Sequence, residues 1–132
     1  MLISQPKKIL IVDDEKDVLV YLGNILRRER FEVIAAASGQ EAIELARKLC
    51  PDLIILDMLI PDISGAGVAT ILSEGELTAR IPILFLTGMI DTQEATLIKK
   101  QAAGAISGSH VIMAKPVNKK ELLTTIRKII SP

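Results

Sequence analysis

The sequence predicts an α/β fold in which five parallel strands form one sheet with helices on both faces. Five short apolar runs recur along the 132 residues. Four of them are continuous rather than alternating, as expected for strands that are covered on both faces. Segments with helical spacing of apolar side chains separate the runs. Strand and helix therefore alternate five times, a pattern that is typical of parallel sheets.

The apolar runs themselves are the expected strands. They are Ile9–Val12, Val33–Ala36, Leu53–Leu56, Ile83–Leu86 and Val111–Ala114. Three of the helices are indicated by apolar side chains that recur at three- and four-residue steps. These side chains are Val18, Leu19, Leu22, Ile25 and Leu26 in the first helix, Ala42, Ile43, Ala46 and Leu49 in the second, and Leu122, Ile126, Ile129 and Ile130 in the last.

Capping residues mark where three of the helices begin. Ser38 is followed three residues later by Glu41, which is a capping-box pattern. Asn118 precedes the last helix, with Glu121 in the matching position. Asp91 is placed to cap the fourth helix. These signals divide the chain into the alternating elements that the apolar pattern predicts.

Length and composition indicate one soluble globular domain that spans residues 1–132. Hydrophobic residues make up 49% of the chain, charged residues 24%, and only one Tyr and two Phe are present. A surface that stacks on nucleic-acid bases needs more aromatic side chains than this. Lys plus Arg and Asp plus Glu both number 16, so the net charge gives no attraction for a polyanion. We therefore expect no direct binding to nucleic acid.

The sequence indicates a reducing, cytoplasmic environment. Cys50 is the only cysteine, which excludes an internal disulfide and a cysteine-based metal site. No apolar run approaches the roughly 20 residues that span a bilayer. The segment from Met1 to Lys8 lacks the apolar stretch of a signal peptide. We therefore expect a cytoplasmic protein that does not bind membranes and carries no second domain.

The unusual polar residues follow the predicted strands directly. Asp13 and Asp14 come after the first strand, and Asp57 ends the third. Thr87 ends the fourth strand and Lys115 the fifth. In open α/β sheets, ligands bind at the carboxyl ends of the strands, where the strand order reverses. For the order 2-1-3-4-5, this reversal lies between the first and third strands, which carry the three aspartates.

These residue types favour phosphoryl chemistry assisted by a metal ion. Three carboxylates at a partly buried site repel one another and need protons or a cation. Magnesium fits best, because it prefers oxygen ligands and often shares them with a phosphate. No His or Cys lies near these strand ends, which argues against zinc and copper. Lys115 and the Thr87 hydroxyl can bind an anion, so the set predicts phosphoryl transfer to a carboxylate.

Each of these residues has an ordinary structural explanation when it is taken alone. An Asp-Asp pair after a strand is commonly a turn and a helix cap. Thr87 and Lys115 are equally ordinary in turns and loops. Asp57 is harder to explain, because burying a carboxylate at the end of an apolar strand is costly. Four such features at the ends of four different strands favour a functional site.

The chain resembles the receiver domains of two-component response regulators over nearly its whole length. The matching stretches are Ile9–Glu15, Asp52–Gly65, Pro82–Gly88 and the pair Lys115-Pro116. The combined motif is highly specific, although each piece alone is not. The resemblance implies a single-domain, flavodoxin-like, doubly wound sheet with strand order 2-1-3-4-5.

The resemblance also implies a set of metal ligands. Asp57 would be the phosphoacceptor and would itself face the Mg²⁺ ion. Asp14 would bind Mg²⁺ directly, and Asp13 would bind it through water. The backbone carbonyl of Leu59 would be a further ligand.

The remaining implied roles concern the phosphoryl group and the partners. Lys115 would contact the phosphoryl oxygens, and Thr87 would move toward the phosphoryl group and carry the conformational switch. The phosphodonor would be a sensor histidine kinase or a histidine phosphotransfer protein. A downstream protein would bind the face formed by the fourth helix, the fifth strand and the fifth helix. The domain would promote only its own phosphorylation and dephosphorylation and would not be an enzyme in the ordinary sense.

Two features depart from the family pattern. Receivers often carry Tyr or Phe three residues before the lysine, whereas this chain has Ile112, which cannot couple to the threonine as those residues do. The segment Ile106–His110 is a few residues longer than the usual connection to the fifth strand, and its Ser and Gly content indicates a loop. We therefore predict a partner surface unlike that of the better-known receivers.

Three further features are interpreted as structural. Gly65-Ala66-Gly67 is expected to form a turn that enters the third helix, because it does not directly follow a strand. His110 is the only histidine and is expected to be a solvated loop residue. Cys50 is expected to be a small, buried hydrophobic residue near the end of the second helix.

Three alternatives stay open from the sequence alone. The chain could be the receiver part of a larger regulator or of a hybrid kinase. An aspartate-based phosphatase of the haloacid dehalogenase type would place a second Asp two residues after the nucleophile, but Leu59 occupies that position and cannot transfer protons. A degenerate receiver that acts only through protein binding is the third alternative, and the complete set of acids, threonine and lysine argues against it.

Overall fold

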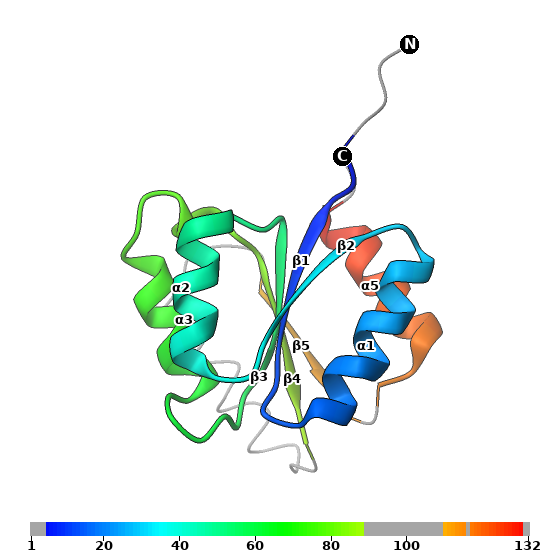
Figure 1. Ribbon diagram of the computed structural model, residues 1–132, viewed down its shortest axis with the longest axis horizontal. Coiled ribbons are helices and arrows are strands. Elements are labelled where there is room, and N and C mark those ends of the chain that lie inside the picture. The colour runs from blue at the N-terminus through cyan, green and yellow to red at the C-terminus, as the bar shows by residue number, and fades with distance from the viewer. Residues whose placement is uncertain (1–4, 89–109, 116, 131–132) are drawn as a thin grey trace.

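The computed structural model describes residues 5–88, 110–115 and 117–130, which form one sheet between two helical layers (Figure 1). All strand pairs are parallel, in the order β2-β1-β3-β4-β5. The strands are β1 (Lys8–Val12), β2 (Glu32–Ala36), β3 (Leu53–Asp57), β4 (Ile83–Thr87) and β5 (Val111–Ala114). The helices are α1 (Lys16–Arg28), α2 (Gly39–Leu49), α3 (Gly65–Ser73), the 3-10 helix η1 (Thr78–Arg80) and α5 (Lys119–Ile130). The predicted fold class and strand order are confirmed.

The helices cover both faces of the sheet, with α2 and α3 on one side and α1 and α5 on the other (Figure 1). Each face has its own core, because successive strand residues point to opposite faces. Leu10, Ile54 and Phe85 are fully buried on the α2–α3 face, and Ile9 and Leu84 on the α1–α5 face. A register slip of one residue would move every side chain of a strand to the opposite face of the sheet. Close packing on both faces therefore fixes the register of the strands, and with it the residue at which each strand ends.

The helix starts follow the predicted caps. The Ser38 hydroxyl accepts the backbone N–H of Glu41 at 3.1 Å, and the Glu41 carboxylate accepts a backbone N–H in return at 2.9 Å. At α5, the Asn118 side chain accepts the N–H of Glu121 at 3.0 Å. Both predicted caps are therefore confirmed. Asp91, predicted to cap a fourth helix, lies outside the described residues.

Within the described ranges, no helix is both long enough and apolar enough to span a bilayer.

Two predictions about single residues were wrong. Cys50 is exposed, because it caps the end of α2 in a left-handed conformation with φ of 45° and turns the chain out of the helical pattern. His110 is partly buried rather than solvated. Its Nδ1 accepts the backbone N–H of Ile83 at 3.0 Å, and its ring meets that of Phe85 edge-on with the ring centroids 6.1 Å apart.

Candidate functional site

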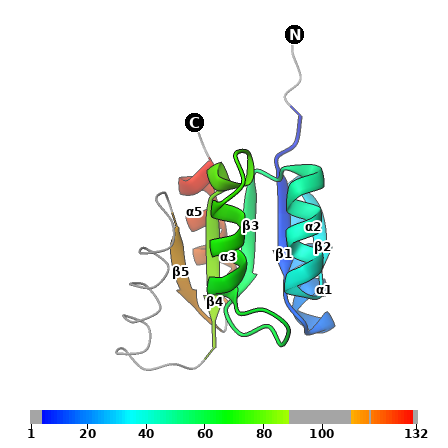
Figure 2. The ribbon, with the colours of Figure 1, turned by 90° about the vertical axis from the view of Figure 1, so that its left-hand side faces the viewer.

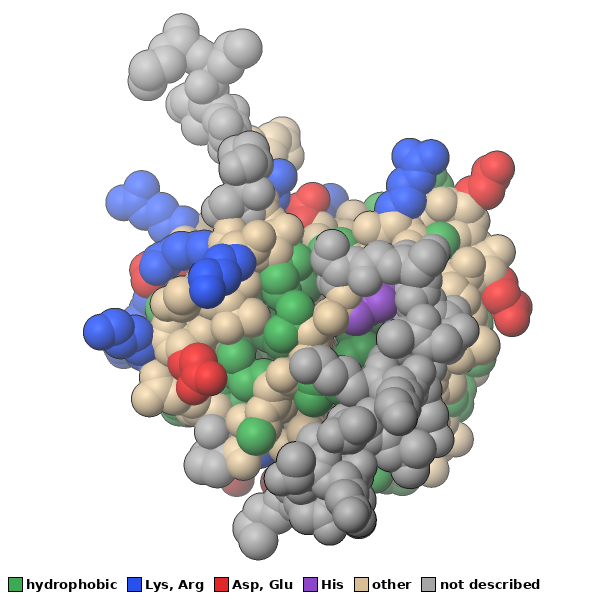
Figure 3. Space-filling view, turned by 180° about the vertical axis from the view of Figure 1, so that it is seen from behind, with side chains coloured by type: hydrophobic (Ala, Val, Ile, Leu, Met, Phe, Trp, Pro, Cys, Tyr) green, Lys and Arg blue, Asp and Glu red, His purple; other side chains and the backbone are tan. Residues whose placement is uncertain are grey.

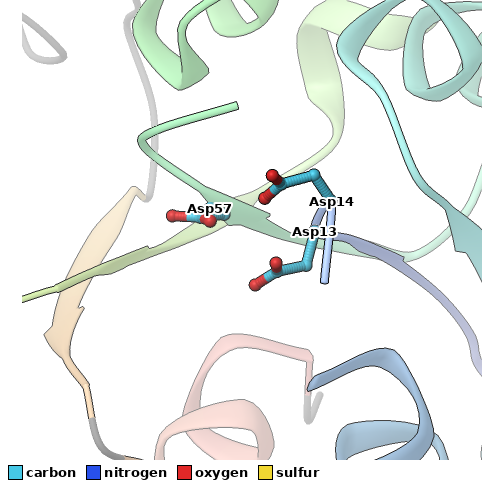
Figure 4. Close-up of side chains that lie close together, drawn as sticks. All are labelled: Asp13, Asp14 and Asp57. Atoms are coloured by element: carbon cyan, nitrogen blue, oxygen red, sulfur yellow. The ribbon is translucent and has the colours of Figure 1, made fainter. Parts of the chain in front are cut away.

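Three carboxylates meet at the carboxyl ends of β1 and β3, which are neighbours in the sheet. Figure 4 shows Asp13 and Asp14 at the end of β1, beside Asp57 at the end of β3. One oxygen from each side chain lies within 4.8 Å of those of the other two. Asp13 and Asp57 are 1% and 6% exposed, whereas Asp14 is open to solvent. The sequence-predicted acids therefore form one cluster with an accessible side.

Lys115 joins the same cluster from the far edge of the sheet. Its Nζ lies 2.9 Å from Asp13 Oδ2 and 3.4 Å from Asp57 Oδ2. Its backbone N–H donates to the carbonyl of Thr87 at 2.7 Å, which ties the end of β5 to the end of β4. Partial burial works against the ammonium charge, but the bond to Asp13 and the charges of Asp57 and Asp13 outweigh it and raise the pKa of Lys115 above its ordinary value.

Of the two buried carboxylates in the cluster, Asp57 has the weaker contacts to offset its negative charge. Burial is the main cause that raises its pKa above the ordinary value, and the negative charge of Asp13 adds to this. The N–H of Leu59, which donates to Asp57 Oδ1 at 3.2 Å, and the charge of Lys115 work in the opposite direction without cancelling it. Asp57 therefore gains most from a second cation near its oxygens.

Thr87 lies at the same rim of the sheet. It is the last residue of β4 and is 3% exposed. Its neighbour Leu86 pairs with Asp57 in the ladder between β3 and β4, and Thr87 itself pairs with Ala114 in the ladder between β4 and β5. The predicted threonine is thus one step along the sheet edge from the candidate phosphoacceptor.

The loop after Asp57 passes close to the site and is sterically tight. The N–H of Gly65 donates to the carbonyl of Met58 at 2.9 Å. A Cβ on Gly65 would lie 2.8 Å from Met58 Cα and 2.9 Å from the carbonyl oxygen of Asp57, so only glycine fits without a backbone shift. The turn predicted for Gly65-Ala66-Gly67 was wrong, because these residues form the first turn of α3 itself, which begins at Gly65 after the N-cap Ser64. Leu59 follows Asp57 by two residues, and its side chain is 73% exposed.

The charges and donor types of the cluster fit a hard divalent cation. Three ionised carboxylates and one ammonium leave two negative charges (−3 + 1 = −2) among Asp13, Asp14, Asp57 and Lys115. Every ligand atom that the cluster offers is a carboxylate oxygen, the type that magnesium, calcium and manganese prefer. The cluster contains no imidazole or thiolate, which agrees with the prediction against zinc and copper.

Ile112 and the segment before β5 are the two places where the sequence departs from the receiver pattern. Ile112 is partly buried and packs against the core on the α2–α3 face. Its aliphatic side chain fills space there but offers no hydroxyl group. Residues 106–109 of the predicted long loop lie outside the described residues.

Sequence reasoning missed one residue of this region, Asp62. Its carboxylate accepts the N–H groups of Gly39 and Gln40 at the start of α2, at 2.9 and 3.0 Å. These partners lie 23 and 22 residues away in the chain, so no local pattern reveals the contact. The only signal in the sequence was that Asp62 is an acidic residue in the loop between β3 and α3, a residue type that commonly caps a helix N-terminus.

A cleft of about 530 Å³ opens beside the cluster, between α1 and the end of β5. Its lining is mostly apolar, with one lysine and one glutamate near the acids. The lining residues are Glu15, Val18, Tyr21, Leu22, Gly88, Lys115 and Val117. The cleft borders the acidic cluster through Lys115, whose Nζ contacts Asp13 and Asp57.

Comparisons with known proteins identify the family. The family described as the response regulator receiver domain matches residues 9–127. The alkaline phosphatase synthesis transcriptional regulatory protein PhoP of Bacillus subtilis is 34% identical over 124 residues, which are 94% of this chain and 48% of that protein. The chain spans about half the length of the curated relatives it matches.

Solved structures show the same fold. The chemotaxis protein CheY4 of Vibrio cholerae has a TM-score of 0.81 and 29% identity, and the match covers 94% of this chain and 98% of that one. The receiver domain of the sensor histidine kinase PA1611 of Pseudomonas aeruginosa shares the fold at a TM-score of 0.81 and 23% identity, over 96% of this chain and 99% of that one. That structure has a magnesium ion coordinated in its active site cleft. This chain, whose acidic cluster includes Asp57, therefore belongs to the family of receiver domains of two-component response regulators.

Proposed function

We propose that this receiver accepts a phosphoryl group on Asp57 in a Mg²⁺-dependent reaction. The observation that carries the proposal is the meeting of three carboxylates and Lys115 at one rim, with Asp57 beside both the other acids and the ammonium group. In the reaction, an oxygen of Asp57 forms a bond to phosphorus. The phosphorus–nitrogen bond of a phosphohistidine donor breaks, and its electron pair leaves with the imidazole.

The other acids fit the role of cation ligands better than that of nucleophile. Asp13 is engaged on both oxygens, one with Lys115 Nζ and the other with the N–H of Glu15 at 2.9 Å. Asp14 is exposed and flanks the other two. We propose that Asp14 and Asp57 bind Mg²⁺ directly, Asp13 through water, and that the backbone carbonyl of Leu59 completes the protein ligands. When bound, Mg²⁺ neutralises charge that develops on the transferring phosphoryl group.

Lys115 and Thr87 are proposed to recognise the phosphorylated state. A phosphoryl group adds charge and acceptor oxygens at Asp57. Lys115 Nζ already lies 3.4 Å from Asp57 and can turn from its carboxylate partners to phosphoryl oxygens. The Thr87 hydroxyl can donate to the same oxygens if the end of β4 shifts. Such differential contacts move the balance between two conformations of the domain.

The proposed partners follow from these roles. A sensor histidine kinase or a histidine phosphotransfer protein would present its phosphohistidine to the open side of the cluster. A downstream protein would bind the face that includes β5 and α5. Figure 3 shows the β5 side of the molecule, where hydrophobic side chains gather in the middle and most of the Lys and Arg side chains in view stand along one edge. We propose a cytoplasmic location, without direct contact to nucleic acid.

The proposal is tested by phosphorylation with a small phosphodonor such as acetyl phosphate. The unaltered chain should gain the mass of one phosphoryl group when Mg²⁺ is present and should remain unmodified when Mg²⁺ is chelated. Asp57→Asn should remain unmodified in both conditions. A phosphoryl group on the Asp57→Asn chain, or none on the unaltered chain with Mg²⁺, would contradict the assignment.

The domain is proposed to modify only itself. An aspartate-based phosphatase needs an acid–base group two residues after the nucleophile, and Leu59 presents an exposed apolar side chain there. A generic phosphate ester should therefore not be turned over repeatedly. Release of many equivalents of product per chain would favour the phosphatase alternative.

A further inference from the structure

Asp62 connects the loop between β3 and α3 to the N-terminus of α2. Its Oδ1 accepts the N–H of Gly39 at 2.9 Å, and its Oδ2 accepts that of Gln40 at 3.0 Å. The first N–H groups of a helix have no acceptor within the helix, so Asp62 satisfies two of them. These two hydrogen bonds lower the pKa of Asp62, and the positive end of α2 also favours the ionised carboxylate.

The loop and the helix fit closely around this contact. A Cβ on Gly39 would lie 3.0 Å from both Ile63 Cβ and Val68 Cγ2, and 3.4 Å from Asp62 Oδ1. Figure 2 shows the loop after β3 extending toward the start of α2 at one end of the sheet. Because α2 is packed on the sheet through its own buried side chains, Asp62 attaches the loop to a fixed element.

The backbone of Leu59 depends on such attachments. Its N–H donates to Asp57 Oδ1 at 3.2 Å, but its side chain is 73% exposed and contributes little packing of its own. Ile60, which is 5% exposed, holds the loop from the side of the core. Gly65 closes the loop by donating to the carbonyl of Met58. In the outer part of the loop, Ile63 packs against the core on the α2–α3 face, and Asp62 adds the two hydrogen bonds to the start of α2.

We propose that Asp62 is a positioning residue for cation binding, because it fixes the loop on α2 and so keeps the Leu59 backbone in place beside Asp57. This inference rests on the proposed function, in which the Leu59 carbonyl is a ligand of Mg²⁺. Asp62 touches neither the ion nor the phosphoryl group. Without its two hydrogen bonds, part of the binding energy of Mg²⁺ is spent on ordering the loop.

The test measures Mg²⁺ binding to the unphosphorylated chain by isothermal titration calorimetry. Asp62→Ala removes both acceptors and should bind Mg²⁺ about tenfold more weakly, the lower end of the roughly 10- to 100-fold loss seen when residues that orient metal ligands are replaced. Asp62→Asn keeps one acceptor oxygen and should show a smaller loss in the same direction. In each variant, the Mg²⁺ concentration for half-maximal labelling by acetyl phosphate should rise by the same factor. The labelling rate at saturating Mg²⁺ should be unchanged, because no ligand has been removed.

Ser38→Ala is the matched control. It removes the other side-chain cap of α2, the bond from the Glu41 N–H, and leaves the loop after β3 attached. Its unfolding temperature should fall while its Mg²⁺ affinity stays unchanged. Equal losses of affinity in Ser38→Ala and Asp62→Ala would show that Asp62 acts only through the stability of α2 and would overturn the inference.

The remaining outcomes separate this inference from the proposed function. If the unaltered chain binds Mg²⁺ and Asp62→Ala binds it equally well, the positioning role is overturned and the metal site stands. If the unaltered chain binds no Mg²⁺, the proposed metal site itself fails and the inference falls with it. A labelling rate that stays low for Asp62→Ala at saturating Mg²⁺ would also overturn the inference, because a positioning residue is compensated by excess cation.

Discussion

Asp13 and Asp57, the two buried acids of the site, differ in the contacts that offset their negative charges. Asp13 has a lysine ammonium at 2.9 Å and a backbone N–H at 2.9 Å, one for each oxygen. Asp57 has a backbone N–H at 3.2 Å and the same ammonium at 3.4 Å. The shorter contacts compensate Asp13 more fully, and burial keeps the pKa of Asp57 raised. In the absence of a cation, the ionised Asp57 carboxylate therefore destabilises the folded chain.

Asp57→Asn should stabilise the metal-free protein. Because the pKa of Asp57 is raised on folding, its ionised form at neutral pH is less favourable in the folded chain than in the unfolded chain. An amide removes that charge and keeps an acceptor for the Leu59 N–H. We expect a gain on the order of 1 kcal/mol, or a few degrees in melting temperature, by thermal unfolding with a chelator. The gain should shrink as the pH falls through the pKa of the folded carboxyl.

Asp52→Asn is the matched control for this substitution. Asp52 precedes β3 at the opposite end of the strand, and its carboxylate accepts the N–H of Lys8 at 2.7 Å. The same change from acid to amide should weaken that bond and lower stability by about 1 kcal/mol. A loss of stability in Asp57→Asn as well would contradict the view that its charge is poorly compensated.

Among the elements, β4 and β5 form a pair whose first hydrogen bond depends on a side chain. Their pairing begins at Val111, opposite Leu84. The N–H of Ile83, one residue earlier, therefore has no strand residue of β5 opposite it. His110 supplies the acceptor through Nδ1 at 3.0 Å. This bond requires an unprotonated Nδ1, so the edge of the sheet is linked to the ionisation of one imidazole.

The stability of the β4–β5 edge should decline in mildly acidic solution. Burial lowers the pKa of His110 below its ordinary value of 6.5. Well above pH 6.5 the imidazole is neutral in both the folded and the unfolded chain, so the full stability is present there. As the pH falls below that value, the unfolded chain takes up the proton first, and stability is lost until the folded pKa is passed.

The measurement compares the unaltered chain with His110→Gln in urea unfolding. The unaltered chain should lose on the order of 1 kcal/mol between about pH 7.5 and about pH 5.5 through this group. His110→Gln keeps a side-chain acceptor but has no proton to gain, so its decline should be smaller by that amount. Equal declines in the two chains would assign the pH dependence to other groups.

For the molecule as a whole, the apolar pattern was sufficient to predict the sheet. Because the strands are buried on both faces, each one is a continuous run of hydrophobic residues. The parallel order of the strands then brings the polar residues that follow them, such as Asp13, Asp57 and Lys115, to the same end of the sheet. Asp62 was not predictable, because its partners lie more than 20 residues away. His110 was misinterpreted for the same reason, since its acceptor role depends on Ile83 in another strand. The predicted cap at Asp91 stays untested.

On the proposed function, the same topology restricts Mg²⁺ binding to the folded chain. Asp14 and Asp57 are 43 residues apart in sequence (57 − 14) and meet only when β1 pairs with β3. A ligand that binds only the folded state stabilises it by about 2.7 kcal/mol when its concentration is 100 times the dissociation constant. The melting temperature of the unaltered chain should therefore rise with the logarithm of the Mg²⁺ concentration above that constant.

Ionic strength and a ligand variant separate specific binding from screening of the acidic cluster. NaCl at matched ionic strength should change the melting temperature much less than Mg²⁺ does, because it screens the carboxylates without bridging them. Asp14→Ala removes an exposed carboxylate of the proposed site without disturbing the packed core, so its melting temperature should respond weakly to Mg²⁺. If Asp14→Ala responded as strongly as the unaltered chain, Mg²⁺ would be acting as a general counterion. The acids at the ends of β1 and β3 would then not form a specific Mg²⁺ site.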